Sequence, residues 1–206
     1  MEFQETVRRR RMVRSFRPDP VDPALVDRLL DDALRSPSAG NSQGRELVVL
    51  EGPTQTARFW DITLPAERRE GFAWPGLLLA PVLVIPLADS SRYLERYAEA
   101  DKAATGLGDG TERWPVPYWT VDTAFATMTL LHGVVDAGLG ALFFGIFRNE
   151  AELMARLGVP EHLRPIGTVA IGHPAPEERP GRSAGRTRRP FDDVVHRGTW
   201  GGSGTR

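Results

Sequence analysis

The chain has 206 residues, of which 41% are hydrophobic and 26% charged, and this composition is typical of a folded globular protein with one domain over residues 1–206. A formal net charge of -1 excludes a global electrostatic attraction to nucleic acid or to an anionic membrane, so we expect neither partner. The sequence contains no cysteine, which excludes disulfides, thiolate nucleophiles and cysteine-bound metal centres.

The first half of the chain predicts two helices, followed by strands that alternate with helices. A short helix begins the chain. A second helix begins after Asp22, a good N-cap that precedes a proline, and its apolar side chains recur at helical spacing to Leu34. The other elements expected before residue 90 are a strand at 46–50, a helix at 54–62 and a strand at 82–85.

The second half of the chain predicts a long central helix between smaller elements. Residues 119–137 are apolar on nearly all sides and are followed by Gly138, so we expect a helix that is buried on several sides. Asn149 and Glu152 have the spacing of a capping box for a helix that continues to Leu157. Also expected are a helix near 92–102, a Gly- and Pro-rich lid at 106–117, and strands at 141–147 and 166–171.

Together these elements predict an α+β domain built as a three-layer α/β/α sandwich. The longest apolar run, residues 77–88, is interrupted by Pro81 and Pro86 and is too short to cross a bilayer. The N-terminal basic run follows acidic residues and leads into no apolar core, unlike a secretory signal. We therefore expect a cytoplasmic protein with no membrane partner.

Arginine is concentrated at two places in this nearly neutral chain. Six of the ten residues from Arg8 to Arg17 are arginine. A second group near the C-terminus comprises Arg182, Arg186, Arg188 and Arg189. Because arginine binds phosphate bidentately, the two groups predict an anion site at which both ends of the chain meet. The alternatives are a solvated basic face or a weak nucleic-acid patch for the first group, and a disordered tail for the second.

Other catalytic patterns are weak. The four histidines lack metal-ligand spacing, so we expect no metal site. Residues 181–185 have the form G-x-S-x-G but lack the flanking strand and helix of a nucleophile elbow. The sequence also contains no Walker A motif and no complete dinucleotide glycine motif. Phosphate binding must therefore come from the arginines, and any redox chemistry must come from a bound cofactor.

Several segments, in order, resemble the nitroreductase superfamily. RRMVRSF at 10–16 and PSAGNSQ at 37–43 are similar to the R-x-x-x-R-x-F segment and the P-S-x-x-N-x-Q loop of that family. DAGLGALFFG at 136–145 resembles the end of its long helix and its flavin-facing strand. LGVPEHLRPIGTVAIGHP at 157–174 resembles its next strand, and RTRRPF at 186–191 its terminal K-x-R-R-P-L segment. The resemblance covers nearly the whole chain.

The resemblance implies a mixed, mostly antiparallel sheet and an interlocked homodimer with FMN bound between the two subunits. It also implies NAD(P)H as co-substrate and a planar small-molecule acceptor, such as a nitroaromatic or a quinone, in a ping-pong cycle. In such an enzyme no catalytic side chain needs to exchange protons with the substrate.

Carried over onto this sequence, the resemblance implies a cofactor site that both subunits build. The residues implied at the phosphate and ribityl end are Arg10, Arg11, Met12 (through its backbone), Arg186 and Arg188, and the partner subunit would contribute Pro37, Ser38, Ala39 and Asn41. Arg14 would approach the flavin N1/O2 edge, where a guanidinium stabilises the negative charge that reduction adds. The backbone of Phe144 and Gly145 would lie near N5 and orient hydride transfer.

Aromatic residues suggest a substrate pocket for planar molecules: Trp74, Trp114, Tyr118 and Trp119. Packing of the three lid aromatics in the core or in the dimer interface is the alternative. The sequence also departs from the family pattern. Gln43, Gly44 and Arg45 stand where relatives often have Q-P-W, and residues 73–76 read AWPG where many relatives place an Asn and a Lys toward the flavin.

Two further interpretations stay open at this point. One is a family member with different flavin chemistry, such as a dehalogenase or a flavin-fragmenting ring synthase. The other is a non-catalytic module that binds flavin, or that binds nucleic acid through the Arg8 to Arg17 patch.

Overall fold

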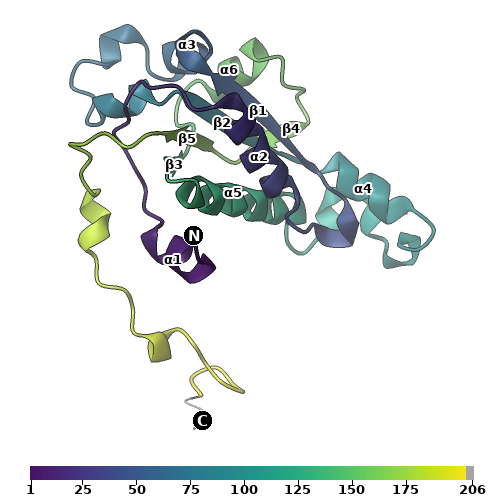
Figure 1. Cartoon of the computed structure of the whole chain (residues 1–206). Coiled ribbons are helices and arrows are strands. Elements are labelled where there is room, and N and C mark those ends of the chain that lie inside the picture. Colours follow the sequence, from purple (N-terminus) through teal and green to yellow (C-terminus); the bar gives the residue numbers. More distant parts are fainter. Residues whose placement is uncertain (203–206) are drawn as a thin grey trace.

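The computed structural model describes residues 1–202, apart from the side chain of Arg182, and has one sheet at its centre (Figure 1). Four strands pair antiparallel in the order β1 (Arg45–Glu51), β2 (Val82–Asp89), β5 (Thr168–Gly172) and β3 (Gly140–Phe144), and β4 (Leu163–Pro165) pairs with the end of β2. A parallel bridge between Met12 and Ala141 adds the N-terminal segment beside β3. The predicted mixed, mostly antiparallel sheet is confirmed.

Helices α2 (Pro23–Leu34) and α5 (Tyr118–Asp136) cover one face of the sheet (Figure 1). As predicted, Asp22 caps α2, because its carboxylate accepts the Ala24 N–H at 3.0 Å. Leu29 of α2 and Val134 of α5 belong to one buried apolar cluster with strand residues such as Val84. The short helix α1 (Phe3–Arg9) packs on α5.

Helices α3 (Gly52–Thr63) and α6 (Glu150–Arg156) cover the opposite face, seen above the sheet in Figure 1. Every residue of β2 is buried, and alternate side chains along it join the two apolar clusters. Val84 points to α2 and α5, whereas Leu83 and Ile85 pack with Phe59 of α3. A strand with both faces covered is the middle layer of an α/β/α sandwich, which confirms the predicted three layers.

Several predicted boundaries are wrong for identifiable reasons. Asn149 has φ of 53°, and its side chain donates to the Ile62 carbonyl at 2.8 Å instead of capping α6, so the capping box does not form. Strand β3 ends at Phe144 rather than at 147. Helix α4 (Ser91–Ala98) gives way to short 3-10 turns four residues earlier than expected at 102. Strand β2 continues beyond residue 85, because Pro86 still pairs with β1.

Large apolar side chains are exposed at several places on the chain, among them the C-terminal arm and helix α5. After Ala175 the chain leaves the body as an arm that carries η7 (Arg182–Gly185) and η8 (Phe191–Asp193) (Figure 1). Trp200 on this arm is 89% exposed. Phe125 and Met128 form an exposed apolar strip on α5, at 49% and 44%. A single subunit therefore buries α5 on fewer sides than its sequence predicts.

Of the helices within residues 1–202, none has both the length and the apolar character that crossing a membrane requires. Within the same residues, no three acidic or histidine side chains gather closely enough to hold a metal ion.

Candidate functional site

The N-terminal arginine segment lies beside β3 and pairs with it near the start of the strand. The Val13 N–H donates to the Ala141 carbonyl at 2.9 Å, and the Phe143 N–H lies 3.5 Å from the Met12 sulfur. This pairing brings Arg14 to the same part of the molecule as Phe144 and Gly145, about 130 residues away in sequence. All three line one hollow, named here the Arg14 hollow, whose volume is about 360 Å³. Its other lining residues include Phe59, Phe72, Trp74, Phe147 and Arg148.

The guanidinium of Arg14 is held from several sides. It lies over the Trp74 ring, with its central carbon 5.3 Å from the ring centroid, and its Nη1 donates to the Met12 carbonyl at 3.1 Å. Gly181 lies against it so closely that a Cβ at that position would be 2.6 Å from Nη1. The wall of the hollow therefore carries a fixed positive charge.

Backbone and aromatic rings complete the Arg14 hollow. The β3 ladder ends with the pair Phe144 and Thr168, so the Gly145 N–H lies beyond the hydrogen bonding of the sheet. The Phe144 ring is parallel to Trp60, with centroids 5.8 Å apart, and lies edge to face with Phe59. A fixed cation, an adjacent peptide N–H and apolar walls fit a flat ring that becomes negatively charged, so the residues present suit the isoalloxazine of FMN.

The predicted phosphate arginines are only partly brought together. Arg10 is half-buried, Arg11 is largely exposed, and Arg186 and Arg188 are exposed on the arm. The side chain of Arg182, which belongs to the same predicted group, is outside the described part. The C-terminal part of the chain contacts the N-terminal segment before the predicted arginine group is reached, because Glu178 and Gly181 lie against Arg14.

Glu178 is a residue near the candidate site that no sequence pattern predicted. Its side chain is 2% exposed, and its Oε1 accepts the backbone N–H of Arg14 at 3.1 Å. Its Oε2 lies 3.8 Å from Nη2 of Arg11. Sequence patterns did not single it out, because an acidic residue in a Pro-, Gly- and Arg-rich stretch resembles a solvated loop. Its proximity to the arginines depends on the pairing of residues 173–175 with 15–17.

The loop 37–43 is fixed by a buried polar network. The Ala39 N–H and the Tyr93 hydroxyl both donate to Oδ2 of Asp122, at 2.8 and 2.7 Å. Burial, and then the hydrogen bond to Asp122, raise the pKa of Tyr93 well above its usual 10.0. Arg45, at the position where relatives often have Trp, is also buried and donates to the Leu34 and Ser36 carbonyls at the end of α2.

The loop and the Arg14 hollow lie in different parts of one subunit. The loop packs against α4, which Figure 1 places on the far right, whereas the hollow lies between α3 and the end of β3. Residues of the loop, including Pro37, Ser38, Ala39 and Asn41, are not among those that line the hollow. A flavin bound in the hollow would meet this loop only if a second copy supplied it.

The predicted substrate aromatics separate into two groups. Trp74 lines the Arg14 hollow. Trp114 is 8% exposed and packs edge-on against Tyr97, with centroids 4.7 Å apart, while its Nε1 donates to the Leu107 carbonyl. Trp119 joins the same aromatic cluster, and Tyr118 is 38% exposed. Within one subunit, Trp114 thus packs the expected lid, residues 106–117, against α4.

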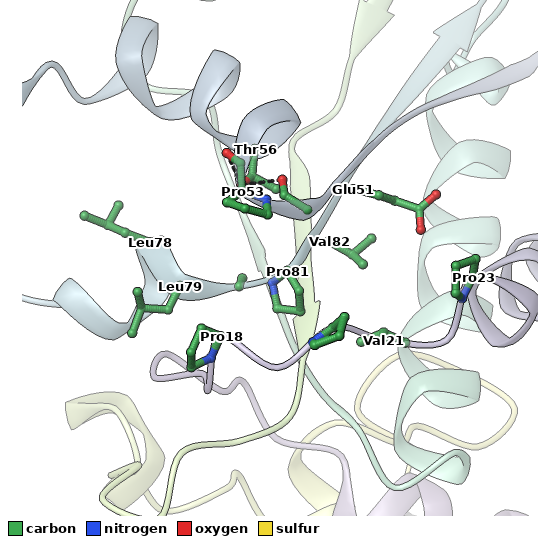
Figure 2. Close-up of a pocket in the computed structure, with 13 residues that line it drawn as sticks. Pro18, Val21, Pro23, Glu51, Pro53, Thr56, Leu78, Leu79, Pro81 and Val82 are labelled. Atoms are coloured by element: carbon green, nitrogen blue, oxygen red, sulfur yellow. Dashed lines mark hydrogen bonds between the residues drawn. The ribbon is translucent and has the colours of Figure 1, made fainter.

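A larger hollow of about 510 Å³ lies at the end of β1 and contains none of the predicted site residues. Figure 2 shows its walls, built from Pro18, Pro53, Pro81 and the aliphatic side chains around them. Glu51 is the charged residue of its lining. A hollow of this kind offers no cation to a phosphate or to a reduced ring, so the Arg14 hollow is the candidate site despite its smaller volume.

Comparison with known proteins identifies the family of the chain. The model of the nitroreductase family matches residues 7–173. The chain is 28% identical over 205 residues to an NADH dehydrogenase of Thermus thermophilus, covering 91% of each chain. It is 26% identical over 191 residues to an NAD(P)H FMN reductase of Bacillus subtilis, covering 92% of this chain and 71% of the relative.

Solved structures show the same fold. A nitroreductase-like protein of Streptococcus mutans superposes with a TM-score of 0.75 at 18% identity, covering 95% of this chain and 97% of that one. A nitroreductase of Bacillus subtilis gives 0.73 at 22% identity, covering 97% of this chain and 75% of that one. Because the family model spans the core elements and the residues of the Arg14 hollow up to His173, the chain belongs to the nitroreductase family.

Proposed function

We propose that the protein is an FMN-dependent oxidoreductase that takes hydride from NAD(P)H and passes it to a planar acceptor such as a nitroaromatic or a quinone. The observation that carries the proposal is that the Arg14 guanidinium, held over the Trp74 ring, and Gly145 at the end of β3 line one aromatic-walled hollow. The names of the relatives, FMN reductase and NADH dehydrogenase, support the cofactor and the electron donor.

The residues of this chain then have distinct roles. FMN, when bound, supplies the hydride-transfer chemistry. Arg14 holds positive charge at the edge of the ring that becomes negative, and the Gly145 N–H orients the reacting edge without a side-chain acid. Arg10, Arg11 and the backbone of Met12 bind the phosphate and ribityl end, and Arg186 and Arg188 close over the phosphate. Trp74 forms a wall for planar substrates.

The site requires a homodimer under this proposal, because the loop 37–43 lies far from the Arg14 hollow of its own subunit. The exposed strip of Phe125 and Met128 on α5, together with the arm, supplies apolar surface for a second copy. Phe125→Glu combined with Met128→Glu should yield monomers that lose FMN, and sedimentation equilibrium measures the first effect. A double variant that stays dimeric would exclude this face as the interface.

The test of the function uses the purified protein. It should be yellow, release FMN on denaturation, bleach on addition of NADH or NADPH, and regain its colour with a quinone. Retained flavin that neither nicotinamide bleaches would instead favour the dehalogenase or ring-synthase chemistry, and the absence of any flavin would favour a nucleic-acid module. Arg10→Ala combined with Arg186→Ala should give soluble, colourless protein, whereas unchanged flavin content would overturn the phosphate site.

A further inference from the structure

We propose that Glu178 is a positioning residue of the flavin site, and that its buried carboxylate lowers the reduction potential of the bound flavin by offsetting the charge of Arg11 and Arg14. This inference rests on the proposed function. It concerns a residue for which the family resemblance implies no role, and it follows from the contacts that the structure places around one carboxylate.

The first step is that the carboxylate of Glu178 has too few hydrogen bonds for its only role to be holding the backbone of Arg14 in place. The side chain of Glu178 is 2% exposed, and Oε1 accepts the Arg14 N–H at 3.1 Å. Within residues 1–202, the buried Oε2 has no hydrogen-bond partner. A buried carboxylate oxygen is normally hydrogen-bonded, since leaving it unpaired costs free energy. The electrostatic attraction of the Arg11 guanidinium, whose Nη2 lies 3.8 Å away, is therefore the main interaction that offsets the cost of burying Oε2.

The second step is that the segment carrying Glu178 is shaped around Arg14. Three residues after Glu178, Gly181 lies so close to the Arg14 guanidinium that a side chain there would displace it. Glu178 and Arg14 also line a second hollow, of about 540 Å³, which shares Trp74 with the Arg14 hollow. The carboxylate thus fixes the backbone of Arg14, while Trp74 and Gly181 fix its side chain.

The third step is electrostatic. A negative charge inside a cluster of arginines reduces the positive potential that the cluster exerts on a bound ring. Reduction makes that ring more negative, so the carboxylate disfavours the reduced form relative to the oxidised form. The Glu178 carboxylate is buried, so salt screens its effect on a ring bound nearby less than it screens exposed charges, and the effect should persist at physiological ionic strength.

The experiment compares Glu178→Gln with the wild type and with Glu177→Gln, a matched control at the exposed neighbouring position. Glutamine keeps an oxygen for the Arg14 N–H and removes only the charge. We expect Glu178→Gln to favour the reduced flavin by about tenfold, a rise of about 30 mV for a two-electron couple. Redox-dye titration measures this potential, and fluorescence quenching measures the FMN dissociation constant, which should fall. The control should move neither quantity.

The outcomes separate this inference from the proposed function. If the wild type binds no flavin, the proposed function fails. If all three proteins bind flavin and Glu178→Gln leaves the potential at the value of Glu177→Gln, the inference about Glu178 alone is overturned. Should Glu178→Gln fail to fold, Glu178→Asp retains the charge but withdraws it by one methylene from Arg11. In Glu178→Asp the preference for the reduced flavin should increase by less than tenfold, so the potential should rise by less than about 30 mV. An unchanged potential would again overturn the inference.

Discussion

Replacing Asp122 with alanine should destabilise the protein by about 2 to 4 kcal/mol, because one oxygen of this residue accepts hydrogen bonds from two donors, one buried and one partly buried. The Tyr93 hydroxyl, on a side chain with 0% exposure, and the Ala39 N–H both donate to Oδ2. Each donor left without a partner costs about 1 to 3 kcal/mol. The Ala39 N–H lies on a partly exposed loop and can reach water, which places the sum below the upper limit.

Urea unfolding measures this cost. With a slope of about 2 kcal/mol/M, the expected loss lowers the midpoint by about 1 to 2 M. Asp136→Ala on the same helix is the matched control, because its side chain is 51% exposed and pairs with the N-terminal amine, at 2.7 Å. An exposed ion pair contributes about 0 to 1 kcal/mol. All variants are compared at one protein concentration, since dimerisation shifts the apparent stability.

The same substitution tests the proposed role of the loop. If Ala39 and its neighbours contact the flavin of the partner subunit, Asp122→Ala should weaken FMN binding more than Asp136→Ala does, in protein that is still folded. A midpoint for Asp122→Ala that equals that of Asp136→Ala would refute the reasoning about the network. A lowered midpoint with unchanged FMN affinity would refute the role of the loop alone.

Three further predictions follow from single contacts. The pKa of Tyr93 is raised in the folded protein, so this tyrosine ionises at a lower pH in the unfolded chain than in the folded one. The free energy of unfolding of the wild type should therefore fall above about pH 10, by up to about 1.4 kcal/mol per pH unit. Urea unfolding of Tyr93→Phe should show a smaller decrease over the same pH range, because phenylalanine does not ionise. In Gly145→Ala the new Cβ meets the Phe147 ring at 3.0 Å, and since that ring is 88% exposed it can move, so the unfolding free energy should change by less than about 1 kcal/mol while FMN affinity falls about tenfold. In the described chain the buried Nε1 of Trp60 has no partner, so thermal and urea unfolding of Trp60→Phe should show a loss of about 1 kcal/mol rather than the 3 to 5 typical of an aromatic-to-alanine change.

The fold was predictable where local chemistry and tertiary packing agree. The Asp22 cap and the apolar stripe of α2 predicted that helix, and the aliphatic run at 82–85 predicted a buried strand. Both predictions hold because the apolar side chains that form each pattern are the ones that the fold buries. Asn149 shows the opposite case. Its spacing to Glu152 fits a capping box, yet its side-chain amide donates to the Ile62 carbonyl, 87 residues away. No local sequence pattern could predict that hydrogen bond.

The candidate site was predictable as a set of residue types but not as an arrangement. The resemblance named Arg14, Phe144 and Gly145 separately, and the pairing of residues 12–13 with β3 explains why they share one hollow. Glu178 could not be identified in this way. Its contacts depend on the pairing of residues 173–175 with 15–17, and long-range pairing of this kind has no periodic signature in the sequence.

Helix α5 links the loop network to the proposed interface, because it carries a determinant of each within one turn. Asp122, on its buried face, fixes the Ala39 N–H of the loop, and Phe125, one turn later, is half exposed toward the proposed partner. A shift of α5 that improves packing between subunits must also move the carboxylate that holds the loop. If the loop contacts the flavin across the interface, flavin binding and subunit association share one rigid element, and by thermodynamic linkage each strengthens the other. The polar network around Asp122 is then the part of the fold through which dimerisation sets the geometry of the cofactor site.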